Sequence, residues 1–203
     1  MRFARREPID AALLHEMVDD AASLDLADGF VFTVGESILD LEAAPQGGSR
    51  FPVQARMAGR PFVGFHIDIG IGDDLFEPTD SIEGEGWFDF AGLPRPTFLM
   101  ISREQQFAEK LHAYTRPRGD RDNSRVKDLV DLVLLTRTQM EPHRLRENVE
   151  RTFARRATHN LPAALMPPPE SWRPRFAELA EQCGIEGDLH DAHRLVEDYI
   201  RHL

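Results

Sequence analysis

The sequence predicts an α+β protein with a small mixed sheet in its first half and helices in its second half. Two observations indicate this division. Apolar and polar side chains alternate through residues 50–71, whereas apolar residues recur with a helical period after residue 102. We therefore expect a partial sheet region over residues 1–101 and a helical region over residues 102–203.

The first half is expected to begin with a helix and to continue in strands. Pro8 suits the first turn of a helix, and apolar residues recur along one face after it. Ala58-Gly59-Arg60 is a short connection of the kind that joins two strands in a hairpin. The expected elements are a helix over residues 8–24 and strands over residues 30–34, 50–57, 63–72 and 97–101.

A helical period governs the second half. Phe107, Leu111 and Tyr114 recur as one buried stripe. The segment LVDLVLL is apolar almost all the way round, so we expect its helix to lie at the centre of the core, with Asn123 or Ser124 as the N-cap. The expected helices span residues 103–115, 124–138, 142–156, 171–183 and 189–202.

The composition is that of a folded chain with an acidic surface. Its 203 residues suffice for one domain or two small ones, and the net charge of -11 argues against indiscriminate nucleic-acid binding. The arginines within residues 116–127 and 144–156 either form local basic sites for RNA or a triphosphate, or belong to solvated faces interleaved with acids. Cys183 is the only cysteine, which fits a reducing compartment. No apolar run reaches the about 18 residues of a membrane span, so we expect a cytoplasmic protein.

Asp68 is the first candidate for chemistry. It lies in the middle of an expected strand between Ile67 and Ile69, on a face where glycines leave room for a ligand. A carboxylate placed in this way can bind Mg²⁺ or accept a proton from an attacking hydroxyl. An aspartate on an edge strand that simply faces water fits the same pattern, and the spacing leaves both interpretations open.

A second candidate set lies in two of the expected helices. Lys110 is either a phosphate ligand or an ordinary solvated lysine. Asp128 and Asp131 lie three residues apart on one helix face, where they either act on a nucleotide or pair with Arg125 or Lys127. We expect Asp131 to be the more buried of the two aspartates.

Four segments of the chain resemble the AbiEii/AbiGii family of nucleotidyltransferase toxins. They are RFPVQARMAGRPFVGFHIDIGIGD, FAGLPRP, EQQFAEKLHAYTRPRG and SRVKDLVDLVLL, and they cover most of residues 29–137. Their order is specific, because a strand-borne DIG precedes EKLHA and then SRVKDLVDL. The resemblance implies a truncated fold similar to the DNA polymerase β-type nucleotidyltransferases, followed by a helical C-terminal half.

The same resemblance implies roles for individual residues. Asp68 matches the third metal-binding carboxylate, which implies Mg²⁺ as cofactor and activation of the acceptor hydroxyl. Lys110 and Asp128 match the lysine and the acid that the family uses around the nucleotide, and Arg125 and Lys127 are then candidate nucleotide ligands. The implied reaction transfers a nucleotide from a nucleoside triphosphate to an acceptor such as tRNA, and the implied protein partner is a cognate antitoxin.

The chain departs from the family's pattern in one motif. The family's Gly-Gly or Gly-Ser loop with a following Asp-x-Asp pair is not found, and Gly35-Glu36-Ser37 before Asp40 is too closely spaced to replace it. Because two of three metal carboxylates would then be missing, we expect transfer by this chain to be impaired. The alternatives are a non-catalytic module that binds a nucleotide or a partner protein, and an unrelated metal-dependent phosphotransferase or hydrolase.

Overall fold

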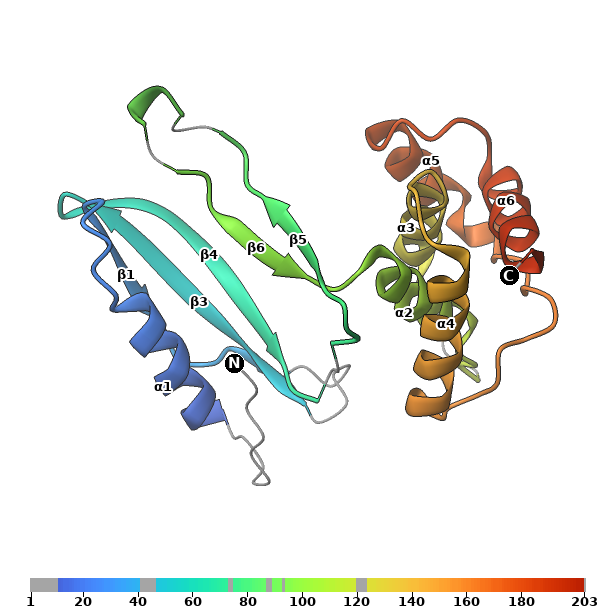
Figure 1. Ribbon diagram of the computed structural model, residues 1–203, viewed down its shortest axis with the longest axis horizontal. Helices are drawn as coiled ribbons and strands as arrows, with labels where there is room; N and C mark the ends of the chain where they lie inside the picture. The colour runs from blue at the N-terminus through green and yellow to red at the C-terminus, as the bar shows by residue number, and fades with distance from the viewer. Residues whose placement is uncertain are drawn as a thin grey trace. The chain divides into compact units, whose positions relative to one another are not determined.

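The computed structural model describes residues 11–40, 47–72, 75–86, 89–92, 94–119 and 124–202. The chain forms two compact units, residues 1–74 and residues 75–203 (Figure 1). The strands all precede residue 101 in the described part, and five of its α-helices follow residue 102. Small sheets and separate helices confirm the predicted α+β class.

The first unit is a four-stranded sheet with one helix on it. Strand β3 is central: β1 and β2 pair with one of its edges and β4 with the other. In the part of the unit that is described, every pairing is antiparallel. The prediction of a mixed sheet was therefore wrong for these strands. The elements are α1 (Ala11–Ala22), β1 (Phe30–Val34), β2 (Leu39–Asp40), β3 (Gly48–Met57) and β4 (Arg60–Gly70).

The hairpin of β3 and β4 confirms the predicted strand pair. Ala58 and Gly59 form its turn with φ angles of 48° and 78°, the left-handed values of the tight turns that match strand twist. Phe51 and Val53 of β3 pack with Leu14 of α1 in a small core. Because successive side chains alternate between the faces of a sheet, Asp68 lies on the face opposite α1.

Pro52 explains why β1 and β2 are separate strands. The carbonyl of Pro52 accepts a hydrogen bond from the N–H of Gly35 at 2.8 Å, so the backbone of Pro52 faces the edge where β1 and β2 lie. Proline has no N–H to donate there, which interrupts the ladder between Val34 and Leu39 without disturbing the pairing with β4. A Cβ on Gly35 would lie 2.9 Å from the Pro52 ring, so this position requires glycine.

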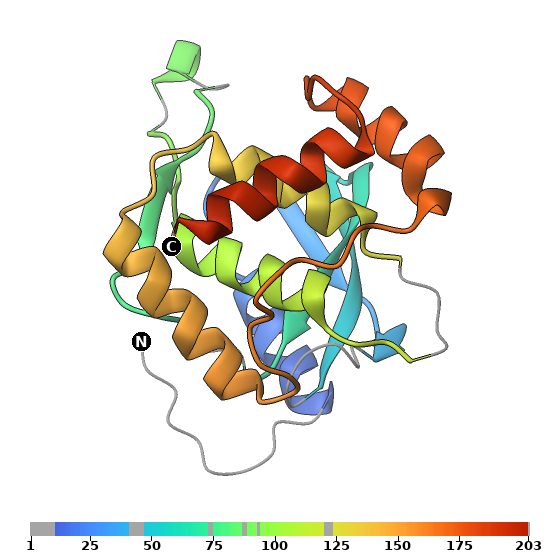
Figure 2. The same ribbon diagram turned by 90° about the vertical axis from the view of Figure 1, so that its right-hand side faces the viewer.

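The second unit joins a two-stranded ribbon to a helical core. Helix α3 is in contact with α2, α5 and α6, and Leu129, Leu132 and Val133 on it are buried. This confirms the predicted central place of the LVDLVLL helix (Figure 2). The elements are β5 (Asp80–Glu83), β6 (Thr97–Met100), α2 (Arg103–Thr115), α3 (Val126–Thr136), α4 (Pro142–Arg156), α5 (Arg173–Gln182) and α6 (Leu189–Arg201), with short 3-10 turns at Asp89–Ala91 and Glu170–Trp172.

Most element boundaries follow the sequence pattern. The exceptions are the N-cap of α3 and the strands β2 and β5, of which β2 has only two residues. Helices α2 and α4 have the predicted limits, and α1, α3, α5 and α6 fall inside theirs. The N-cap of α3 is Arg125 rather than Ser124, while Asn123 lies outside the described residues. Strand β5 was not predicted, because Ile82 is the only apolar side chain in it. None of the helices in the described ranges has the length and apolarity needed to cross a bilayer.

Candidate functional site

The site begins with Lys110, whose ammonium bridges two carboxylates of α3. Its Nζ lies 2.6 Å from Asp131 and 3.3 Å from Asp128. Asp128 also pairs with Arg125 at 3.5 Å, at the start of the helix. The sequence prediction therefore named residues that the structure brings together: Lys110, Asp128 and Arg125 form one cluster between α2 and α3.

Asp128, not Asp131, is the buried acid of this cluster. The side chain of Asp128 is 7% exposed and that of Asp131 is 38% exposed, so the expectation that Asp131 is more buried was wrong. The reason is helical phase: Asp128 shares its turn with the buried Val126 and Leu129. A buried carboxylate is costly unless cations and hydrogen bonds compensate its charge, and Lys110 and Arg125 do so here.

Arg118 is a third cation near Asp128. Arg118 also lies close enough to Asp128 for their charges to interact, and it donates a hydrogen bond to the Ala113 carbonyl. Burial lowers the pKa of Arg118, and the neighbouring Arg125 and Arg116 lower it further. Three cations, Lys110, Arg125 and Arg118, therefore lie around the carboxylate of Asp128.

Lys110 remains charged despite partial burial. Burial alone would lower the pKa of its ammonium, but Asp131 and then Asp128 hold that pKa above its ordinary value. Lys127 lies on the exposed side of the first turn of α3, and its side chain has no ion pair within the described residues. The cluster therefore combines the ion-paired ammonium of Lys110 with the exposed Lys127 on the first turn of α3.

Two histidines lie where the C-terminal end of α2 meets the residues after α4. His112 is 5% exposed and lies 2.9 Å from the Thr158 hydroxyl, while His159 lies 2.8 Å from the Thr115 hydroxyl. Burial first, then His159, Arg156 and Arg116, lower the pKa of His112 from 6.5 to about 4, so its ring is neutral near pH 7. These contacts tie α2 to the residues that follow α4.

Asp68 has a different environment in the first unit. Arg50, its cross-strand partner, donates two hydrogen bonds of 2.6 Å to the two carboxylate oxygens. These hydrogen bonds are the main reason that the pKa of Asp68 is lowered. Asp68 is exposed, as expected for an edge-strand aspartate that faces water, but its oxygens are paired with the guanidinium of Arg50.

The described residues around Asp68 do not by themselves fit a magnesium site. Mg²⁺ takes several oxygen ligands in a near-octahedral shell, whereas here a single carboxylate is paired with a guanidinium. Within the described ranges, no group of three His, Cys, Asp or Glu side chains is arranged to hold a metal ion. The assignment of Asp68 as a metal ligand stays a prediction.

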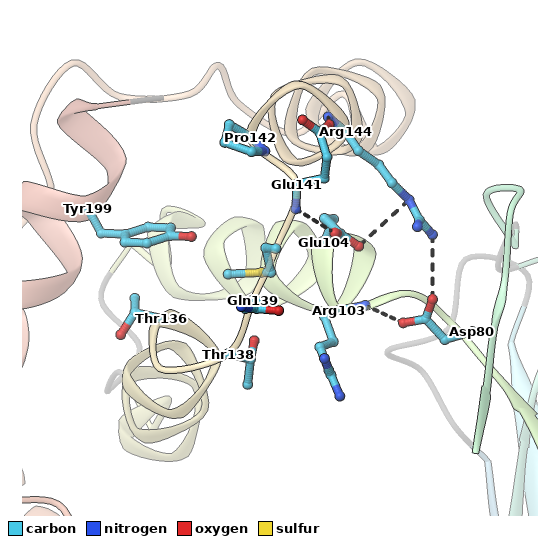
Figure 3. A pocket seen from close by; sticks show the side chains of 11 residues that line it. Asp80, Arg103, Glu104, Thr136, Thr138, Gln139, Glu141, Pro142, Arg144 and Tyr199 are labelled. Carbon is cyan, nitrogen blue, oxygen red and sulfur yellow. Dashed lines mark hydrogen bonds and ion pairs between the residues drawn. The ribbon is translucent and has the colours of Figure 1, made fainter. Parts of the chain in front are cut away.

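Sequence reasoning missed a pocket in the second unit. It has a volume of about 650 Å³ and lies where α2 and α4 begin and α3 and α6 end (Figure 3). Glu104, Arg144 and Asp80 form a chain of ion pairs along one side, with N–O distances of 3.7 and 3.8 Å. The residues that line it are spread along the chain from residue 80 to residue 199, so no local sequence motif predicts this pocket.

Comparison with known proteins identifies the family. A family model described as "Nucleotidyl transferase AbiEii toxin, Type IV TA system" matches residues 5–198 of the chain, which confirms the predicted family. A search of curated proteins finds none that matches. The match spans both units and includes Asp68 and the Lys110 cluster. The chain belongs to the AbiEii family of nucleotidyl transferase toxins of type IV toxin–antitoxin systems.

Proposed function

We propose that this protein transfers a nucleotide from a nucleoside triphosphate to an RNA acceptor such as tRNA, with transfer impaired by the lack of the Asp-x-Asp motif, and that the Lys110 cluster binds the triphosphate. The observation that carries the proposal is the ammonium of Lys110 held by Asp131 and Asp128, with Arg125 and Arg118 beside Asp128. A lysine that stays charged and is fixed in direction can neutralise the charge on a transferring phosphoryl group. The family match supports the reaction class.

Each residue of the cluster has a distinct part in this proposal. Lys110 contacts the phosphates directly. Asp128 and Asp131 position Lys110, since both lie within ion-pair distance of its Nζ. Arg125 and Lys127 bind phosphate oxygens at the start of α3, where helix N–H groups also favour an anion. The exposed single cysteine, Cys183, suits a reducing compartment, so we place the activity in the cytoplasm and expect a cognate antitoxin to counter it.

The test is a transfer assay with the purified chain, total tRNA and each of the four α-labelled nucleoside triphosphates. Lys110→Gln is expected to lower transfer by about 100-fold, since an electrostatic partner of the phosphates is lost. Asp131→Asn is expected to lower transfer by about tenfold, because Lys110 keeps only Asp128. Arg175→Gln, which changes an exposed arginine on α5 paired with Glu178, is the matched control and should leave transfer unchanged.

A non-catalytic module that binds a nucleotide or a partner protein is the second candidate. The observation that favours it is the carboxylate of Asp68, whose oxygens are engaged by Arg50. Calorimetry with each triphosphate, with and without Mg²⁺, separates the candidates. Triphosphate binding that requires Lys110 without any transfer would support the module, whereas transfer that Lys110→Gln abolishes supports the enzyme. Triphosphate binding and transfer that are both insensitive to Lys110→Gln would refute the assigned site.

A further inference from the structure

The pocket at the start of α2 contains one charged side chain whose charge is not compensated within the described residues. The Glu104 carboxylate accepts a hydrogen bond from the Glu141 N–H at 3.0 Å, and Glu141 in turn accepts one from the Arg144 N–H at 2.8 Å. Asp80 accepts one from the Arg103 N–H at 3.2 Å. The three acids of the pocket are thus engaged, two of them also by the Arg144 guanidinium.

Arg103 differs from these groups. Its backbone binds Asp80, but its guanidinium forms no ion pair in the described part of the chain, and Figure 3 shows the side chain pointing away from Asp80. An arginine fork of this kind suits a phosphate or a carboxylate, because it can donate two parallel hydrogen bonds.

Two further polar groups of the lining are available to a ligand. The hydroxyl of Tyr199, which reaches in from α6, and the amide of Gln139 have no hydrogen-bond partner among the described residues (Figure 3). Burial, and then the charge of Glu104, raise the pKa of Tyr199, so its hydroxyl stays protonated. Met140 and Pro142 add apolar surface beside the tyrosine ring.

We propose that this pocket binds a single nucleotide, with the phosphate on Arg103, the base against the ring of Tyr199, and the base edge on Gln139. A nucleotide has the three features that the pocket can satisfy: one anionic group, a flat ring that stacks on an aromatic side chain, and uncharged donors and acceptors. A volume of about 650 Å³ is in the range of small-molecule sites.

The position of the pocket deepens the proposed function, on which this part of the inference rests. Arg103 and Lys110 lie seven residues apart on α2, which is two helical turns and about 10 Å. Both belong to the partly exposed side of the helix, together with Gln106. A strand held by Arg103 would therefore run toward the Lys110 cluster, so the pocket is a site for a nucleotide of the acceptor RNA rather than for the triphosphate.

The experiment is calorimetry on the full chain with two kinds of probe: the four nucleoside 5′-monophosphates, and a short single-stranded oligoribonucleotide. Arg103→Gln is expected to weaken binding of both probes by about tenfold, since a charge-assisted contact to phosphate is lost. For the oligoribonucleotide it should also reduce the slope of log affinity against log salt by about 0.7. Tyr199→Leu removes the stacking ring, whereas Tyr199→Phe keeps it and should retain most of the affinity.

Arg175→Gln is the matched control, because Arg175 is also an exposed arginine in the first turn of a helix. Binding of the oligoribonucleotide but not the monophosphates assigns the pocket to an RNA strand, and binding of both assigns it to the nucleotide unit itself. Affinities that Arg103→Gln and Tyr199→Leu leave unchanged would overturn the proposal. So would Arg103-dependent binding of an acidic peptide with no nucleotide binding. Lys110→Gln could lose triphosphate binding while Arg103→Gln and Tyr199→Leu bind both probes as the wild type does. That result would refute the assignment of the pocket and leave the proposed function intact.

Discussion

Acidification should destabilise the second unit through His112. The side chain is 5% exposed, and its pKa lies at about 4 instead of 6.5 because burial disfavours the imidazolium. Between these two pH values the unfolded chain binds a proton that the folded chain does not. By linkage, stability is then complete above about pH 6.5 and falls as the pH decreases toward about 4.

The magnitude follows from the difference between the two pKa values. At about 1.4 kcal/mol for each pH unit, a pKa lowered from 6.5 to about 4 corresponds to about 3 kcal/mol of stability lost over that interval. The pKa of His159 is also lowered by burial and by Arg116, so it adds a loss in the same direction. A loss of this size is a large fraction of the stability of an ordinary domain.

The assay is urea unfolding followed by circular dichroism at several pH values from about 7.5 to about 4. His112→Asn keeps a polar group near Thr158 but removes the titrating ring, so its stability should vary less with pH by about 3 kcal/mol over the interval. His143→Asn, an exposed position in the first turn of α4, is the control and should follow the wild type. Parallel curves for the wild type and His112→Asn would refute this reasoning, whatever their offset.

Three further changes test other parts of the structure. Leu132→Ala in α3 removes a fully buried side chain and should lower the free energy of unfolding by about 2–5 kcal/mol in urea; a loss below about 1 kcal/mol would contradict the central place of this helix. Glu104→Gln should cost about 1–3 kcal/mol in the same assay, because a buried, ion-paired carboxylate is lost, whereas the exposed Glu147→Gln should cost almost nothing. Arg50→Gln should raise the pKa of Asp68 toward its ordinary value, as followed by carboxyl carbon NMR; an unchanged titration would show that the pair does not form in solution.

The sequence predicted those parts of the fold that depend on local patterns. The hairpin followed from strict alternation and from Ala58-Gly59, where left-handed backbone angles are needed. Strand β5 was not predicted, because its pairing with β6 depends on backbone hydrogen bonds and Ile82 is its only apolar residue. A local sequence pattern predicts an element when the side chains of that element show its periodicity. It does not predict a strand that forms mainly through backbone pairing with a partner strand.

The candidate site was predictable in membership but not in geometry. The family motif pointed to Lys110 and Asp128, and the structure brings them to 3.3 Å. The closer contact, with Asp131, depends on the phase of α3 against α2, which sequence spacing does not fix. The pocket of Arg103 and Tyr199 was missed for the same reason, since it exists only once the ends of several helices meet.

The interruption opposite Pro52 has a consequence for self-association of the first unit. Without it, residues 30–40 could form one uninterrupted border strand, and a long exposed border with free N–H and C=O groups invites strands of other chains. Two short strands, β1 and β2, separated by the irregular residues 35–38, offer a poor template on that side of the sheet. A proline without its own donor thereby limits aggregation along this border while the hairpin with β4 remains intact.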